Sequence, residues 1–214
     1  MKTDTEQLDK WCGAFGEDYT SRNTFKDFQE FENLYVNRYG IKRTDLNNEW
    51  IGHISKDSKI LEVGTNLANQ LKCLEHMGYD NLYGIEAQEN VVKHVRQTHP
   101  QLQVIRAFAQ DIPYKDNFFD LVFTNNVLIH ISPEDINSVI DEIYRVSKKY
   151  IWGFEYYSDE YVEINYRGNE QLLWKANYCK LFQARYPELK LINSKIMPCL
   201  DEQDNVDKIF LLEK

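Results

Sequence analysis

The sequence of 214 residues lacks the features that mark several classes of protein. It has no internal repeat, no low-complexity segment and no Gly-, Ser- or Pro-rich linker, and it contains only nine glycines and five prolines. Its 43% hydrophobic content is enough for a packed core, which argues against a disordered or fibrous chain. We therefore expect a single domain over residues 1–214 that is stable without disulfides or a structural metal.

Cysteines and long apolar runs are also scarce. The four cysteines lie far apart and show no metal-type pairing, so we expect reduced thiols, a cytoplasmic protein and no metal site. The chain does not open with a basic segment followed by an apolar run, and its most apolar stretch, residues 121–131, is interrupted by polar residues. We expect neither export nor a membrane span.

Positive charge is in deficit. The 25 Lys and Arg residues against 34 Asp and Glu give a formal net charge of −9, with the acidic residues spread along the chain. The densest basic stretch, Lys42 and Arg43, is soon followed by Asp45, and we expect these two side chains to be solvated at the surface. A nucleic-acid partner is disfavoured because phosphate binding needs clustered basic residues.

Aromatic residues are plentiful in the first 55 residues. They recur at helical spacing, with Phe28, Phe31 and Tyr35 on one face. This pattern predicts a helical N-terminal cap over residues 1–55.

From residue 56 the pattern alternates between short apolar runs and helical segments. Strands are expected at 60–63, 82–85, 103–107, 118–124 and 150–155, with helices ending near 77 and covering 89–98 and 136–146. A helix over 170–186 is expected next, followed by strands at 189–196 and 208–212 that no helix separates. The fold class is therefore α/β and Rossmann-like, with a seven-stranded, mostly parallel sheet that has an antiparallel C-terminal strand.

The segment Glu62-Val63-Gly64-Thr65-Asn66-Leu67-Ala68 ends the first strand and opens a helix, where such sheets bind ligands. Asn66 occupies the position of the second glycine of a nicotinamide-binding loop, and no Gly-Lys-Ser/Thr of a phosphate-binding loop is present. S-adenosylmethionine has no phosphate to bind. Gly64 would keep the backbone close to it, and Glu62 would face its cationic sulfonium and amino groups.

Two further acids follow successive strands. Glu86, with Ala87 beside it, lies 22 residues after Gly64, where a carboxylate can accept from both ribose hydroxyls of an adenosine. Asp111 could accept from the adenine amino group while Ile112 packs on the ring. The alternative for Glu86 is a surface acid, and the alternative for Asp111 is an acid that caps a helix or stabilises a turn. Together the three acids indicate an adenosine whose far end is a cation.

Other positions complete the expected cofactor site. Thr124 and Asn125 would present backbone groups to the methionine portion after the fourth strand, and the cap would offer Arg22 to the methionine carboxylate with help from Tyr19. The alternative for Arg22 is a surface pair with Glu17 or Asp18.

The residues also resemble a known family, the pseudaminic acid biosynthesis-associated methylases. The similarity covers nearly the whole chain and is clearest in four segments: Trp11-Cys12-Gly13-Ala14-Phe15-Gly16-Glu17-Asp18-Tyr19-Thr20-Ser21-Arg22-Asn23, Leu61-Glu62-Val63-Gly64-Thr65-Asn66, residues 120–131, and residues 155–168. It implies the class I S-adenosylmethionine-dependent methyltransferase fold and activity, with S-adenosylhomocysteine as product. Asn66 and Ala68 depart from the Gly-x-Gly-x-Gly loop of the wider superfamily. The family name associates it with nonulosonic-acid sugar pathways.

For catalysis, an acceptor hydroxyl would benefit from a base, and the candidates are Glu155, His130 and Tyr157, in that order. A partly buried structural histidine is the alternative for His130. The expected acceptor-side residues are Tyr156, Glu163, Tyr166 and Arg167, although packing at the sheet edge would also explain the tyrosines. Arg167 is the expected anchor for a carboxylate or phosphate on the acceptor.

Three hypotheses on function remain open. In the first, the acceptor is a small molecule methylated on oxygen or nitrogen, in particular a nonulosonic-acid-type or nucleotide-activated sugar. In the second, the chain is an N-methyltransferase of natural-product or peptide metabolism. In the third, it is a non-catalytic module that only binds the cofactor.

Overall fold

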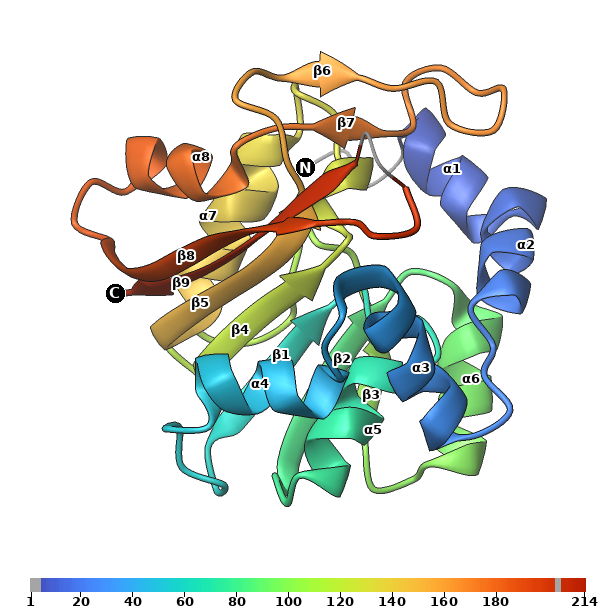
Figure 1. The fold of residues 1–214 in the computed structure, drawn as a ribbon, viewed down its shortest axis with the longest axis vertical. Coiled ribbons are helices and arrows are strands. Elements are labelled where there is room, and N and C mark those ends of the chain that lie inside the picture. The colour runs from blue at the N-terminus through green and yellow to red at the C-terminus, as the bar shows by residue number, and fades with distance from the viewer. Residues whose placement is uncertain (1–4, 203–204) are drawn as a thin grey trace.

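The computed structural model describes residues 5–202 and 205–214, and a central twisted sheet organises it (Figure 1). Seven strands form this sheet in the order β3-β2-β1-β4-β5-β9-β8. Their bounds are β1 (Lys59–Val63), β2 (Asn81–Glu86), β3 (Gln103–Arg106), β4 (Phe119–Asn125), β5 (Ser147–Tyr156), β8 (Lys190–Pro198) and β9 (Val206–Glu213). Strands β1 to β5 pair in parallel, whereas β9 is antiparallel to both β5 and β8. The predicted fold class is confirmed, including the antiparallel C-terminal strand.

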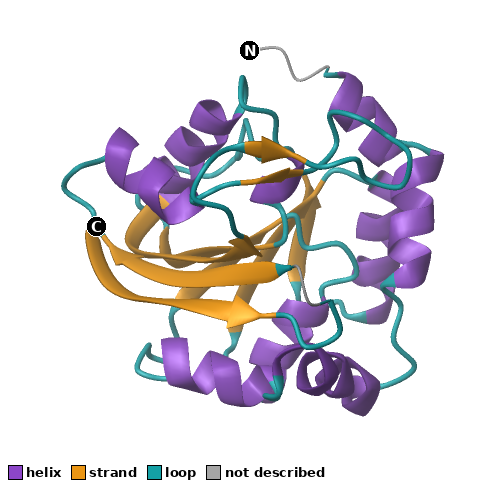
Figure 2. Ribbon diagram, turned by 45° about the horizontal axis from the view of Figure 1, so that its top comes forward, coloured by secondary structure: helices purple, strands orange, loops and turns teal. Residues whose placement is uncertain are grey.

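Helices cover both faces of this sheet (Figure 2). They are α1 (Glu6–Cys12), α2 (Ala14–Arg22), α3 (Phe28–Tyr39), α4 (Arg43–Ile51), α5 (Asn69–His76), α6 (Glu89–Thr98), the 3₁₀-helix η1 (Leu128–His130), α7 (Ile136–Val146) and α8 (Tyr178–Arg185). Buried side chains of α3, α4, α5 and α6 share one core with one face of the sheet. Those of α7 and α8 share a second core with the other face.

The shared helical face predicted for Phe28, Phe31 and Tyr35 is present in α3. Phe31 and Tyr35 are buried in the first core and Phe28 packs against it. Asp27 caps this helix by accepting from the Glu30 N–H, and Gly40 ends it in the left-handed region. Four helices therefore span the predicted cap. However, α3 and α4 lie on the face of the sheet, whereas α1 and α2 lie beside the hairpin of strands β6 (Val162–Glu163) and β7 (Trp174–Lys175) (Figure 1).

One secondary-structure prediction is wrong. The helix expected over 170–186 covers only α8, because Trp174–Lys175 form a short strand β7 that pairs antiparallel with β6 (Val162–Glu163). Asn177 then starts the helix by accepting from the Lys180 N–H. The apolar residues before Asn177 look helical in spacing but are buried in extended chain.

The prediction that Arg43 is solvated is also wrong. Lys42 is exposed, but the Arg43 side chain has an exposed fraction of 0% and points into the core at the start of α4. Its neighbours are the rings of Tyr35, Trp152 and Phe154, with its guanidinium carbon 5.0, 4.9 and 5.5 Å from their centroids.

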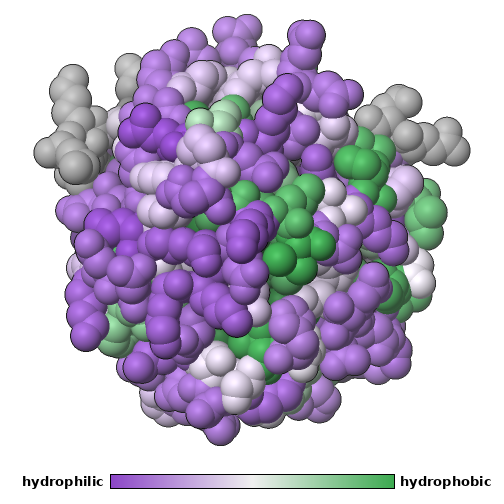
Figure 3. All heavy atoms as spheres, turned by 90° about the vertical axis from the view of Figure 1, so that its left-hand side faces the viewer, coloured by the Kyte–Doolittle hydropathy of each residue, from purple (hydrophilic) through white to green (hydrophobic). Residues whose placement is uncertain are grey.

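The face of the molecule drawn in Figure 3 is mostly hydrophilic, and apolar side chains gather in a patch near its centre. Strand β8, at the end of the sheet, is exposed along nearly all its length. Within residues 5–202 and 205–214, no helix has the length and apolar character needed to cross a membrane.

Candidate active site

A cavity with a volume of about 230 Å³ lies where the parallel strands β1, β2 and β4 end. The loops after these strands, the N-terminal helices and η1 all contribute to its walls. This is where open α/β sheets bind their ligands, because the carboxyl ends of parallel strands meet there. Eight of the sequence-predicted residues line it: Tyr19, Glu62, Gly64, Asn66, Glu86, Ala87, Asn125 and His130.

The loop after β1 holds three residues in the left-handed region. Gly64, Asn66 and Ala68 have φ values of 71°, 45° and 59°. The backbone thus has the conformation that favours glycine at all three positions, although two of them carry side chains. At Gly64 a Cβ would lie 2.7 Å from Val127 Cγ2, so the loop approaches the turn after β4 closely.

Two buried carboxyl groups face the cavity. Glu62 accepts a 2.6 Å hydrogen bond from the Thr65 hydroxyl, and burial raises its pKa to about 8. Glu86 accepts at 2.9 Å from the backbone N–H groups of Asn66 and Gln88, one on each oxygen. Burial also raises the pKa of Glu86, and these N–H groups oppose that rise. Each Glu86 oxygen keeps a lone pair for a further donor.

His130 has a defined tautomer. Its Nδ1 lies 2.8 Å from the Leu172 carbonyl oxygen, which can only accept, so Nδ1 carries the proton and Nε2 has the free lone pair. Burial lowers the pKa of this imidazole to about 4, so it is neutral at physiological pH. The ring lies among aromatic side chains, with its centroid 4.4 Å from that of Trp11 and 5.7 Å from that of Tyr166.

The other two base candidates lie elsewhere. Glu155 has an exposed fraction of 1% and is not part of the cavity wall; it accepts from the Val127 N–H at 3.3 Å. Burial raises its pKa to about 8, against the effect of the N–H groups around it. Glu155 therefore holds the turn that carries η1 and His130. The Tyr157 hydroxyl bonds to Asp159 and does not line the cavity.

Several expected cofactor residues lie outside the cavity wall. Arg22 is exposed at the end of α2, and Asp111 is exposed as well. Ile112 is buried in the second core, and its N–H donates to Glu142 at 2.7 Å. Thr124 is buried within β4. The residues just before Asp111 line the cavity instead: Phe108, Ala109 and Gln110.

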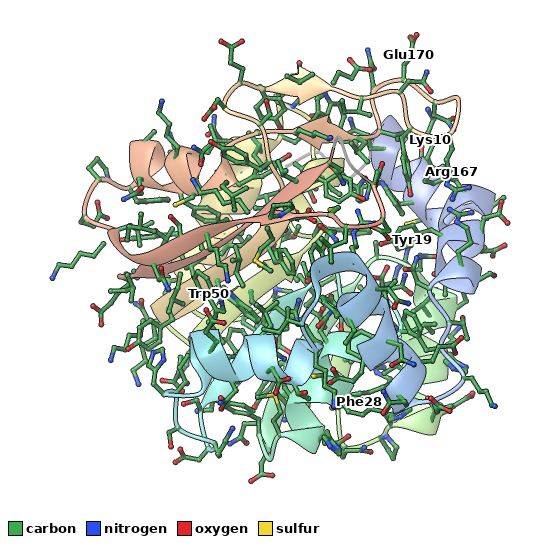
Figure 4. The ribbon with its side chains drawn as sticks, viewed as in Figure 1. Lys10, Tyr19, Phe28, Trp50, Arg167 and Glu170 are labelled. Carbon is green, nitrogen blue, oxygen red and sulfur yellow. The ribbon has the colours of Figure 1, made fainter. Side chains whose placement is uncertain are left out.

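The expected acceptor-side residues lie on β5 (Tyr156), on β6 (Glu163) and on the loop between β6 and β7 (Tyr166 and Arg167). The Tyr156 hydroxyl accepts from Arg38, and Glu163 accepts from the Gln171 N–H. Tyr166 packs on Phe15 of α2, with ring centroids 5.8 Å apart, so this loop contacts the N-terminal helices. Arg167 is exposed on the same loop, and in Figure 4 it lies beside α1 and α2, while Tyr19 projects from α2 toward the body of the molecule.

The sequence prediction missed part of the cavity wall. Trp11, Tyr35, Gln70, Gln88 and Gln110 also line it. Gln88 and Gln110 each follow a strand that carried a predicted site residue, so their positions were within reach of the same argument. No sequence pattern marks Tyr35 and Gln70, because helical spacing places them on core-facing surfaces.

The polar groups that line the cavity suit S-adenosylmethionine. Carboxyl groups line the cavity at Glu62 and Glu86, and among the described residues no Lys or Arg does, which suits a ligand with cationic groups and no phosphate. Buried side-chain oxygens of Gln70, Gln88, Gln110 and Asn126 lack a hydrogen-bond partner. They can accept from the N–H groups of such a ligand.

The sheet order, the antiparallel β9 and this cavity define the fold of class I S-adenosylmethionine-dependent methyltransferases. More particularly, residues 61–150 match the family described as methyltransferase domain. Magnesium protoporphyrin IX methyltransferase from Synechocystis, solved with bound S-adenosylmethionine, superposes over 100% of both chains with a TM-score of 0.70 at 11% identity. S-adenosylmethionine is the cofactor that the domain and fold indicate.

Two curated relatives match parts of the chain. An uncharacterized protein of Haemophilus influenzae is 32% identical over 120 residues, which are 51% of this chain and 45% of that protein. An uncharacterized methyltransferase of Synechocystis is 26% identical over 95 residues, which are 44% of each chain. The matched region is thus less than half the length of either relative.

Proposed function

We propose that this protein transfers a methyl group from S-adenosylmethionine to an oxygen or nitrogen of a small acceptor. The observation that carries the proposal is the cavity at the strand ends, which joins Glu62, Gly64 and Glu86 to the neutral His130. The bound cofactor would supply an electrophilic methyl group on a sulfonium that leaves readily. The chain would bind and orient the two reactants and exclude water from them.

Within this proposal, His130 acts as the general base for a hydroxyl acceptor. Its Nδ1–H is held by the Leu172 carbonyl, so Nε2 is the atom free to take a proton. Glu155 is a positioning residue, because its carboxyl group accepts a hydrogen bond from the Val127 N–H in the turn before η1. Glu86 would bind the ribose hydroxyls with its remaining lone pairs, and Glu62 would face the cationic end of the cofactor.

We further propose that the acceptor is a nonulosonic-acid-type or nucleotide-activated sugar and that the protein works in the cytoplasm. The sequence resemblance supports the sugar, and the exposed Arg167 on the loop beside α1 and α2 offers a donor for its carboxylate or phosphate. Four free cysteines are compatible with a reducing compartment. The rings of Trp11 and Tyr166 next to His130 favour one alternative, an amine, because aromatic faces attract its protonated form, which then releases the proton before the nitrogen accepts the methyl group.

The first test is calorimetric titration of the protein with S-adenosylmethionine and S-adenosylhomocysteine, beside a Glu86→Ala variant. We expect micromolar binding that the variant loses. A folded wild-type protein that binds neither compound would refute the proposal. Binding without turnover of any sugar or amine in an acceptor panel would favour the non-catalytic module.

The second test separates the acceptor classes through His130→Asn. The Asn amide can still donate to the Leu172 carbonyl, but it removes Nε2. For a hydroxyl acceptor we expect unchanged cofactor binding and a turnover at least about 100-fold lower, in line with typical general-base contributions. The acidic limb of the wild-type pH profile should lie near pH 4, because the base is active above its lowered pKa. An amine acceptor should lose far less turnover.

A further inference from the structure

Arg43 is a buried cation that, among the described residues, has no acidic group in direct contact, although its charge opposes the rise in the pKa of the buried Glu62. Its exposed fraction is 0%, its Nε has no hydrogen-bond partner, and the ion pairs among the described residues do not include it. Aromatic rings around the guanidinium offset only part of the cost of burying a charge. An anion bound nearby would stabilise such a buried charge.

Arg43 connects to the cavity through neutral side chains. Its Nη1 donates to Asn125 Oδ1 at 2.8 Å and to the Tyr35 hydroxyl oxygen at 3.2 Å. Gln70 Nε2 donates to the same hydroxyl at 2.6 Å. Asn125, Tyr35 and Gln70 all line the cavity, whereas Arg43 stands behind them.

These hydrogen bonds determine which polar atoms of Asn125, Tyr35 and Gln70 remain available to a ligand in the cavity. Because Asn125 Oδ1 is bound to Arg43, the amide presents its NH₂ group elsewhere, and no hydrogen bond among the described residues uses Asn125 Nδ2. Tyr35 accepts from two donors, and its own proton has only a long contact, 3.4 Å, to Asn125 Oδ1. Gln70 gives its NH₂ to Tyr35, which leaves Oε1 buried and without a partner. One corner of the cavity thus holds two polarised donors and an acceptor.

We propose that Arg43 is a positioning residue for an amino-acid group at this corner, the amino-acid end of the cofactor. The carboxylate would accept from Asn125 and Tyr35, whose donors the guanidinium polarises, and the ammonium would donate to Gln70 Oε1 and lie near Glu62. This inference rests on the proposed function, and it assigns a role in binding to a side chain that never touches the ligand. The predicted Arg22 is not needed for it.

The test compares two ligands that differ only at this end. S-adenosylhomocysteine carries the amino-acid group and 5′-methylthioadenosine lacks it. For Arg43→Met, which keeps an apolar side chain in the core, we expect the affinity for S-adenosylhomocysteine to fall at least tenfold and that for 5′-methylthioadenosine to stay within twofold. Lys42→Met, at the exposed neighbouring position, is the control and should change neither affinity.

A second variant keeps the test decisive if Arg43→Met does not fold. Tyr35→Phe keeps the ring beside the guanidinium and removes the hydroxyl; we expect a selective loss of three- to tenfold for S-adenosylhomocysteine. Unchanged affinity in the folded variants, or equal weakening of both ligands, would overturn the inference and leave the proposed function intact. A wild-type protein that binds neither ligand would refute the proposed function, and this inference with it.

Discussion

Gly64 shows how one residue can set the shape of a binding loop. Its φ of 71° is costly for any residue with a Cβ, and the added atom would also meet Val127 at 2.7 Å. At Gly64 the backbone therefore leaves β1 in a sharp turn that lines the cavity. This position was predicted from sequence, because a glycine directly after a buried strand is informative by itself.

We expect Gly64→Ala to lower the free energy of unfolding by about 2–4 kcal/mol, the sum of left-handed strain and overpacking. Binding of S-adenosylhomocysteine should be lost as well, because the loop must shift. Denaturant unfolding and calorimetry measure the two effects. Gly78→Ala is a matched control, since Gly78 has a φ of 86° with nothing within 4 Å of its added Cβ. Equal destabilisation by both variants would show that the contact with Val127 is unimportant.

Glu155 should make stability depend on pH. Its folded-state pKa of about 8 lies above the ordinary value of 4.5, so the folded protein holds a proton that the unfolded chain releases between these values. The contribution of Glu155 to the free energy of unfolding is therefore complete below pH 4.5, decreases as the pH rises, and is lost once the pH passes about 8. We expect Glu155→Gln to show a smaller drop in melting temperature than wild type between pH 5 and pH 9. The same dependence of melting temperature on pH in both proteins would contradict the raised pKa of Glu155. The pKa of Glu62 is raised as well, but Glu62 is present in both proteins and does not affect the comparison.

At the residue scale, the positions of Gly64, Glu62 and Glu86 could be predicted from the sequence, but the surroundings of Arg43 could not. Glu62 and Glu86 could be placed because strand ends fix where their side chains go. Arg43 could not, since only the packing of α3, α4 and β5 brings Tyr35, Trp152 and Phe154 around it. A basic residue next to Lys42 looks like surface until that packing is known.

At the element scale, the prediction succeeded for segments of at least four residues with an apolar pattern and failed for the two-residue strands. Strands β1 to β5 and helices α6 and α7 follow clear apolar patterns, and the structure confirms them. The two-residue strands β6 and β7 have no periodicity of their own and form by pairing with each other. Leu172 and Leu173, buried in this hairpin segment, were therefore assigned to a helix.

Helices α1 and α2 are expected to respond to ligand. In α2 only Gly16 is fully buried, so little core packing stabilises it, and its link to the loop after β1 is the Thr20–Asn66 hydrogen bond of 3.1 Å. Trp11 and Tyr19 line the cavity and would gain contacts from a ligand. We expect saturating S-adenosylhomocysteine to slow proteolytic cleavage within residues 5–24 at least about fivefold, because binding suppresses local opening. Equal cleavage with and without ligand would contradict the expectation that α1 and α2 become ordered on binding.

At the scale of the whole molecule, ligand binding should raise the melting temperature. At 100 times the dissociation constant, a single site stabilises the folded state by about 2.7 kcal/mol. For a domain of this size that corresponds to roughly 5–10 °C. Differential scanning fluorimetry with S-adenosylhomocysteine measures it, and Glu86→Ala should show less than about a fifth of the shift. A shift of equal size in that variant would place the ligand somewhere other than this cavity.

The position of β9 has a consequence for how the sheet forms as the chain folds. Strand β9 lies between β5 and β8 and is antiparallel to both, although β8 precedes it in the chain. Until β9 is in place, β8 has no partner strand in this sheet, and one edge of β5 stays open. Residues 206–213 must therefore insert between β5 and β8, and a chain in which they have not yet inserted exposes strand edges that can pair with other chains.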